Sequence, residues 1–128
     1  METVKLIINR SELTAGTRGA SLGPDAMKTA ARAGQSTFFS EFETLELENF
    51  NSLLDQPTRF PFAKRIDGLV KVYDQLNTVI SSTIRDKQIP FVLAGDHGSA
   101  GGTIAGIASA LPKARIGVIW IDAHADIH

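Results

Sequence analysis

The sequence predicts an α/β fold built on a parallel β-sheet with helices packed on both of its faces. Short runs of β-branched and apolar residues alternate along the chain with segments whose apolar residues recur every three or four positions. This alternation is typical of parallel sheets with crossover helices. Polar segments that contain histidine follow the last two runs, and ligands bind outside the carboxyl ends of the strands in such sheets.

The first part of the chain supplies two predicted strands and one short helix. Residues 4–9 (VKLIIN) form a β-branched run that suits a buried strand, and residues 44–47 are a second strand candidate. Between them, residues 11–23 hold three glycines and predict a loop. Pro24 stands where the first residue of a helix belongs, and the apolar stripe that follows it stops at Gly34.

The second part contains the clearest helix of the chain. Seven residues at spacings of three and four place one apolar face on a long helix: Ile66, Leu69, Val70, Tyr73, Leu76, Ile80 and Ile84. Residues 91–94 (FVLA) then predict a strand and residues 104–111 a helix. Residues 115–121 (RIGVIWI) are nearly all apolar and predict a last, buried strand that would carry Trp120 and Ile121 into the core.

Composition narrows the classes of partner. The chain has 128 residues, a formal net charge of -1 and no long run of either charge, so we expect neither a nucleic-acid nor a membrane partner. The N-terminus lacks the pattern of a signal peptide and no apolar stretch approaches the roughly 20 residues of a membrane helix, which predicts a cytoplasmic protein. Cysteine is absent, so a metal would have to bind oxygen or imidazole nitrogen.

Asp122, His124 and Asp126 stand at alternate positions directly after the last apolar run. In an extended chain their side chains would share one face, but four residues of strand span roughly 13 Å. The chain must therefore bend after Asp122 if all three bind at one site. Two carboxylates and an imidazole suit manganese or magnesium and leave zinc or iron possible. The purely structural interpretation is that Asp122 caps a turn and His124 is a loop histidine.

A second polar cluster, with Asp96 and His97, follows the preceding predicted strand. Neighbouring parallel strands lie about 4.8 Å apart, so His97 and Asp122 could reach a common metal pair if the two strands are adjacent. Asp96 is expected to orient a neighbouring loop or imidazole rather than to bind metal. The glycines at positions 98, 101 and 102 would let backbone approach a ligand. A phosphate loop is the competing use, but the segment matches no phosphate-binding motif.

Three stretches of the chain resemble the ureohydrolase family, which includes arginase, agmatinase and formimidoylglutamase. They are TRGASLGPDAM, AGDHGSAGGT and WIDAHADIH, and together they run from near the start of the chain to its last residue. The resemblance implies a three-layer fold of the arginase and deacetylase type, incomplete at the C-terminus. Residues 1–128 would form the N-terminal part of a single ureohydrolase domain.

The resemblance also implies a site for two manganese ions (Mn²⁺). By position, His97 would bind the first ion and Asp122 would bridge both. His124 would bind the second ion, and Asp126 would join His97 on the first. The family's later D-x-D pair and its downstream proton-transfer residues are absent from these 128 residues. No catalytic residue is therefore assigned, and we expect the chain by itself to be inactive.

The activity implied is manganese-dependent hydrolysis of a guanidino C–N bond, first of all of L-arginine to L-ornithine and urea, in a homo-oligomeric full-length parent. Agmatinase and formimidoylglutamase activities are close competitors, because His128 stands where arginases place an asparagine that contacts the substrate's α-carboxylate. Two further departures are Ala94, where the family has a glycine, and Gly98, where it has a serine. The chain could also belong to a zinc-dependent deacetylase, which would not require His97, or be an inactive fragment or binding module.

Overall fold

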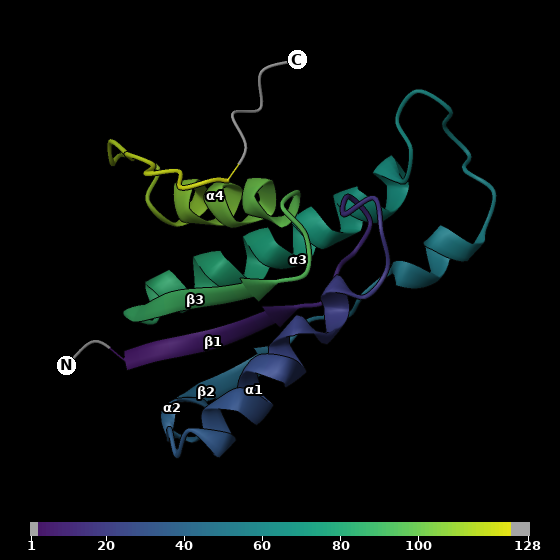
Figure 1. The fold of residues 1–128 in the computed structure, drawn as a ribbon. Coiled ribbons are helices and arrows are strands. Elements are labelled where there is room, and N and C mark those ends of the chain that lie inside the picture. Colours follow the sequence, from purple (N-terminus) through teal and green to yellow (C-terminus); the bar gives the residue numbers. More distant parts are fainter. Residues whose placement is uncertain (1–2, 124–128) are drawn as a thin grey trace.

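The computed structural model describes residues 3–123, and a three-stranded parallel sheet lies at its centre (Figure 1). The strands are β1 (Thr3–Asn9), β2 (Glu43–Glu46) and β3 (Gln88–Ala94), in the order β2-β1-β3. The first strand of the chain is therefore the central one. The predicted strands at 4–9, 44–47 and 91–94 are confirmed, as is the parallel α/β architecture.

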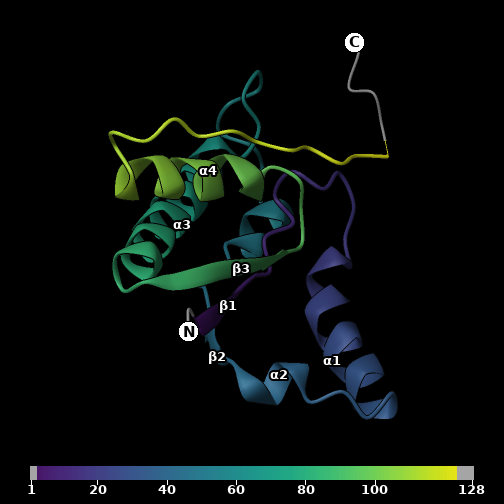
Figure 2. The same ribbon diagram turned by 90° about the vertical axis from the view of Figure 1, so that its left-hand side faces the viewer.

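The helices lie in two groups on opposite sides of the sheet. Figures 1 and 2 show α3 and α4 side by side next to β3, with α1 and α2 on the other side. The bounds are Gly23–Ala33 for α1, Phe38–Glu41 for α2, Ile66–Arg85 for α3 and Ser99–Ala110 for α4, with two 3-10 turns, η1 (Ala20–Leu22) and η2 (Asn51–Asp55). The predicted helices after Pro24 and from Ile66 are confirmed, whereas the sequence does not predict the short helix α2.

Alternation along β1 assigns the helices to the two faces of the sheet. Ile7 belongs to the core cluster that α3 forms with Val72, Leu76 and Ile80. Leu6 is next to Ile7 and must point to the opposite face, where its partner on β3 is Phe91. The ring of Phe38 in α2 packs edge-on against Phe91, with centroids 5.7 Å apart. Helices therefore cover both faces, as the sequence predicts.

Helix α4 packs on α3 through glycines. A β-carbon added at Gly102 would lie 3.0 Å from the side chain of Leu76, and one added at Gly106 would lie 2.6 Å from the β-carbon of Ile80. These glycines bring the two helix backbones close together instead of leaving room for a ligand. The helix consequently begins at Ser99, earlier than the predicted 104–111, because the glycine-rich segment is part of it.

The predicted strand at 115–121 is wrong, since these residues form no strand in the structure. They follow a turn after α4 and run back beside that helix (Figure 2). Ile119 and Ile121 are 91% and 94% exposed and Trp120 is 49% exposed, so the expectation that Trp120 and Ile121 lie in the core is also wrong. A buried parallel strand needs a paired edge and cover on both faces, and within residues 3–123 no element covers the outer side of this segment.

Two buried or half-buried charged side chains hold the loop between β1 and α1. The carboxylate of Glu12 is 3% exposed and accepts hydrogen bonds from the backbone N–H groups of Gly19 and Ser21, each at 2.7 Å. The N–H of Ser21, with help from Gly19 and the charge of Arg18, holds the pKa of Glu12 below its ordinary value against the opposing effect of burial. Arg10 pairs with Asp25 and Glu46 of neighbouring elements, so the loop leaves the sheet in a defined direction.

Within residues 3–123, none of the helices combines the length and the apolar character needed to cross a membrane.

Candidate metal centre

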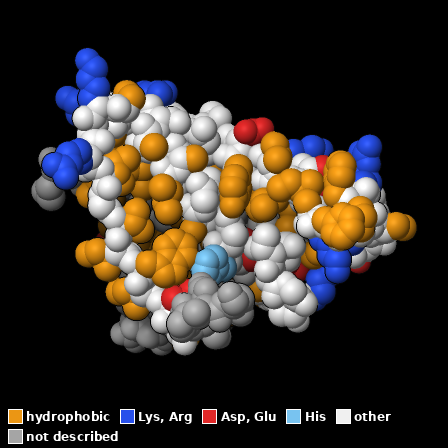
Figure 3. Space-filling view, turned by 90° about the horizontal axis from the view of Figure 1, so that it is seen from above, with side chains coloured by type: hydrophobic (Ala, Val, Ile, Leu, Met, Phe, Trp, Pro, Cys, Tyr) orange, Lys and Arg blue, Asp and Glu red, His pale blue; other side chains and the backbone are white. Residues whose placement is uncertain are grey.

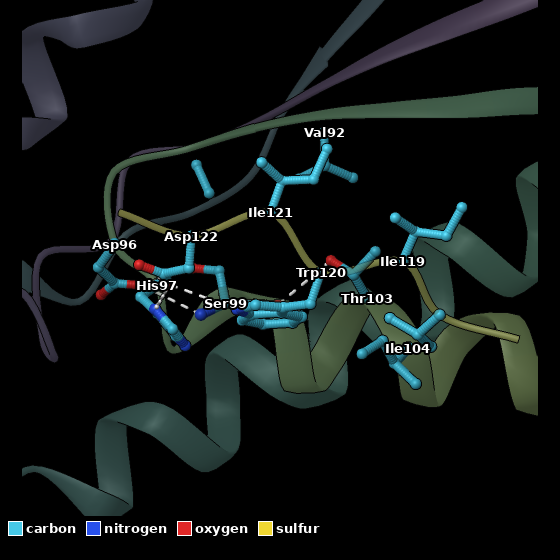
Figure 4. Close-up of a pocket in the computed structure, with 13 residues that line it drawn as sticks. Val92, Asp96, His97, Ser99, Thr103, Ile104, Ile119, Trp120, Ile121 and Asp122 are labelled. Atoms are coloured by element: carbon cyan, nitrogen blue, oxygen red, sulfur yellow. Dashed lines mark hydrogen bonds and ion pairs between the residues drawn. The ribbon is translucent and has the colours of Figure 1, made fainter. Parts of the chain in front are cut away.

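His97 lies just beyond the carboxyl end of β3, two residues before α4 begins. Its side chain is 56% exposed, and its Nδ1 atom is 3.3 Å from Oδ2 of Asp122, whose side chain is 18% exposed. Figure 3 shows a histidine side chain at the surface next to hydrophobic side chains, and Figure 4 shows His97 beside Asp122. The structure thus brings together two of the residues that the sequence singles out, from segments that are 25 positions apart.

These two residues meet by a different route from the one predicted. The predicted route requires two adjacent strands, but the second strand does not form. Instead, residues 118–122 pass over α4, and this path places Asp122 beside His97 (Figure 4). The expectation of adjacent strands is wrong, while the proximity of an imidazole and a carboxylate at this edge of the sheet is present.

Trp120 is a site residue that the sequence does not reveal. Its indole N–H donates a hydrogen bond to Oδ2 of Asp122 at 3.3 Å, and its ring centroid is 4.9 Å from that of His97 at an interplanar angle of 52°. One tryptophan therefore contacts both polar residues and fixes their orientation relative to each other. The only signal in the sequence is an apolar run that ends directly in Asp122, and such a run equally predicts a core position.

A cavity of about 450 Å³ opens beneath these residues, between β3, α4 and the segment 118–122. Its walls are mainly apolar, with Val92, Ile104 and Ile119 among them, and Thr103 adds a hydroxyl (Figure 4). His97 and Asp122 also line the cavity. Apolar walls lower the local dielectric constant, so charges that meet here interact more strongly than they would in water.

A buried polar network fixes the backbone on the N-terminal side of His97. Asp96 is 9% exposed, and its Oδ2 atom accepts hydrogen bonds from the hydroxyl of Ser11 at 2.9 Å and the N–H of Thr14 at 3.1 Å. Its Oδ1 atom accepts from the N–H and the hydroxyl of Ser99, at 3.2 and 2.6 Å. Asn9 donates in turn to the hydroxyl of Ser99 at 2.7 Å. Asp96 therefore orients a neighbouring loop, as the sequence predicts.

The remaining predicted ligands, His124 and Asp126, and the candidate substrate residue His128 lie outside the residues that the structure describes. Within residues 3–123, no three His, Cys, Asp or Glu side chains converge as a metal site. The donors that do meet are an imidazole nitrogen and a carboxylate oxygen. This pair fits manganese in donor type and leaves zinc or iron possible, because both are also bound by nitrogen and oxygen.

Comparison with known proteins covers almost the whole chain. A family profile described as "Arginase family" matches residues 6–128. The arginase of Brevibacillus brevis is 34% identical over 120 residues, which are 91% of this chain and 39% of that protein. The arginase of Bacillus subtilis is 27% identical over 127 residues, which are 99% of this chain and 42% of that protein.

Solved structures agree with these relatives. A crystal structure of arginase from Bacillus subtilis superposes with a TM-score of 0.69 at 27% identity, covering 99% of this chain and 40% of that one. A second structure of arginase, from Bacillus subtilis strain 168, gives a TM-score of 0.72 at 27% identity, covering 100% of this chain and 41% of the other. The chain spans about two fifths of the length of the relatives it matches.

Proposed function

The chain belongs to the arginase family, and from this premise we propose that it forms the N-terminal part of a single ureohydrolase domain. The proposed reaction is hydrolysis of L-arginine to L-ornithine and urea at a site with two manganese ions. The observation that carries the proposal is the approach of His97 to Asp122 within 3.3 Å beside a largely apolar cavity. The relatives reported above are both named arginase, and this name supports L-arginine as the first substrate to test.

In this proposal, His97 and Asp122 hold the metal pair together with His124 and Asp126. His97 would help to hold the first ion and Asp122 would help to hold both, which are the roles that the family resemblance implies. When bound, the manganese pair would supply a water molecule of lowered pKa as the nucleophile that attacks the guanidinium carbon. His128 is the proposed contact of this chain with the substrate's α-carboxylate.

The chain's own residues prepare this site in two ways. Trp120 donates its indole N–H to Asp122 and packs on the ring of His97, so that both side chains are oriented before any ion arrives. The apolar walls of the cavity limit the access of water to one side of Asp122, whereas His97 stays open to solvent. Polar groups whose orientation is fixed in advance stabilise developing charge better than freely rotating groups do.

The proposal includes a small guanidino substrate, a cytoplasmic location and a homo-oligomeric full-length parent. It can be tested by measuring urea release from L-arginine by the natural full-length protein, with manganese and with zinc in parallel. Agmatine and formimidoylglutamate serve as competing substrates, with agmatine cleavage also read as urea and formimidoylglutamate cleavage read as formamide. We expect manganese and L-arginine to give the highest rate. Activity only with zinc and only on acetylated amines would contradict the proposal in favour of a deacetylase.

A second assay uses chain 1–128 alone. We expect no measurable hydrolysis of L-arginine even with excess manganese, because the four proposed ligands offset too little of the charge of two cations. Robust manganese-dependent turnover by this chain, abolished by His97→Ala, would show that these ligands are sufficient.

A further inference from the structure

The loop between β1 and α1 makes hydrogen bonds with both residues that flank His97. On the N-terminal side, the N–H of Thr14 and the hydroxyl of Ser11 donate to the carboxylate of Asp96. On the C-terminal side, the N–H of Gly98 donates to the hydroxyl of Thr14 at 3.1 Å. Thr14 is thus joined to both neighbours of His97, once through its backbone and once through its side chain.

Position 98 requires glycine because a larger side chain would not fit, and not because its backbone conformation is unusual. Its φ and ψ of -58° and -23° are helical values that any residue adopts. A β-carbon added at this position would lie 2.7 Å from Cγ2 and 3.0 Å from Cβ of Thr14, and closer still to its hydroxyl oxygen. The side chain of Thr14 therefore fills the volume that a side chain at position 98 would occupy.

We propose that Thr14 is a positioning residue for His97, and that Thr14 and Gly98 act as a complementary pair. The loop residue supplies the side chain that position 98 lacks, and it satisfies the backbone N–H of that position. Its loss frees the backbone on the C-terminal side of His97, so that the imidazole no longer rests against Trp120 and Asp122. The manganese part of this inference depends on the proposed function, whereas the positioning part does not.

The contact between His97 and Trp120 offers a readout that requires no metal. With ring centroids 4.9 Å apart, protons of the two rings should give a nuclear Overhauser effect (NOE) in chain 1–128, together with ring-current shifts. Thr14→Val keeps the shape of the side chain and removes the hydroxyl, so it should weaken this NOE. Thr14→Ser keeps the hydroxyl and should preserve it. Thr17→Val, at an exposed threonine of the same loop, is the matched control.

The variant Gly98→Ala tests whether position 98 must lack a side chain to fit against Thr14. Gly98→Ala should disturb the NOE because its methyl group would overlap Thr14. The disturbance should be smaller in a Thr14→Ala background, where two of the three close contacts are removed. This double-mutant cycle separates a specific pair from a general loss of folding, which is followed independently by the melting temperature.

A metal titration completes the experiment. Manganese chloride added to the same samples should broaden the ring signals of His97, and Thr14→Val should need about tenfold more manganese for the same broadening, the lower end of the range for groups that orient a ligand. The positioning role is overturned if Thr14→Val leaves both the NOE and the titration unchanged, or if Thr14→Ser is as damaging as Thr14→Val. A normal NOE without any broadening in the unmodified chain would instead contradict manganese binding and leave the positioning role standing.

Discussion

The close approach of α3 and α4 makes the replacement Gly106→Ala a sensitive test of the fold. A β-carbon at position 106 would lie 2.6 Å from the β-carbon of Ile80 and 3.2 Å from the α-carbon of Asn77. Neither atom is the end of a flexible side chain, so rotation of a side chain cannot relieve the overlap. The two helices must move apart along the surface that carries much of the core.

Two opposing effects set the change in the free energy of unfolding that Gly106→Ala causes. Alanine is better than glycine in a helix interior by about 1 kcal/mol, whereas overpacking a close contact costs about 1–3 kcal/mol. Because the overlap involves rigid atoms, the cost should fall in the upper part of that range. The net loss in the free energy of unfolding should be about 1–2 kcal/mol, which lowers the melting temperature by roughly 3–8 °C in a domain of this size.

Urea denaturation and thermal melting, both followed by circular dichroism, measure this change. Gly117→Ala is the control, because a β-carbon at Gly117 meets nothing within 4 Å and its φ is not in the left-handed region. We expect Gly117→Ala to leave the chain as stable as before or slightly more so. If Gly106→Ala is as stable as the control, the packing of α4 on α3 described above is incorrect.

Three further predictions concern the site, acid stability and association. In a manganese titration of the full-length protein, Asp122→Asn should abolish most binding, because an amide cannot neutralise the cations as a carboxylate does, and His124→Asn should weaken it less. Unchanged affinity in both variants would remove them as ligands. The N–H of Ser21 is the main cause of the lowered pKa of Glu12 in the folded chain. The ionised carboxylate therefore stabilises the fold above its ordinary pKa of 4.5, and this stabilisation disappears as the pH falls through the lower pKa of the folded state. Glu12→Gln should therefore flatten the acid side of the melting temperature against pH. Ile119 and Ile121 are 91% and 94% exposed, so we expect chain 1–128 to self-associate through this apolar segment. Ile119→Lys should reduce this association in analytical ultracentrifugation without changing the melting temperature.

Regular periodicity makes most of the fold predictable. Helix α3 can be found because its apolar residues recur at helical spacing over many turns, and α1 because Pro24 and Gly34 mark its two ends. The prediction for the segment 115–121 fails for a physical reason. An apolar run indicates that burial is favourable, but it does not say which neighbour is available to bury it.

The site is predictable only in part, for a similar reason. His97 and Asp122 belong to recognisable polar clusters, and they do meet. Trp120 and Thr14 escape prediction because their roles depend on a partner that is distant in sequence. A tryptophan at the end of an apolar run has no local sign of its contact with His97, and a threonine in a glycine-rich loop has none of its fit against Gly98.

The central position of β1 has a consequence for how the chain folds during synthesis. β1 (Thr3–Asn9) leaves the ribosome before the other two strands, and its partner β3 (Gln88–Ala94) is made only after α3 is complete. The hydrogen bond from Ser11 to Asp96 joins residues that are 85 positions apart. One edge of β1, the most buried strand, therefore stays unpaired until residues 88–94 have been made, which exposes the nascent chain to misassociation. The loop next to His97 then closes in one of the last steps, since contacts of such long range form slowly.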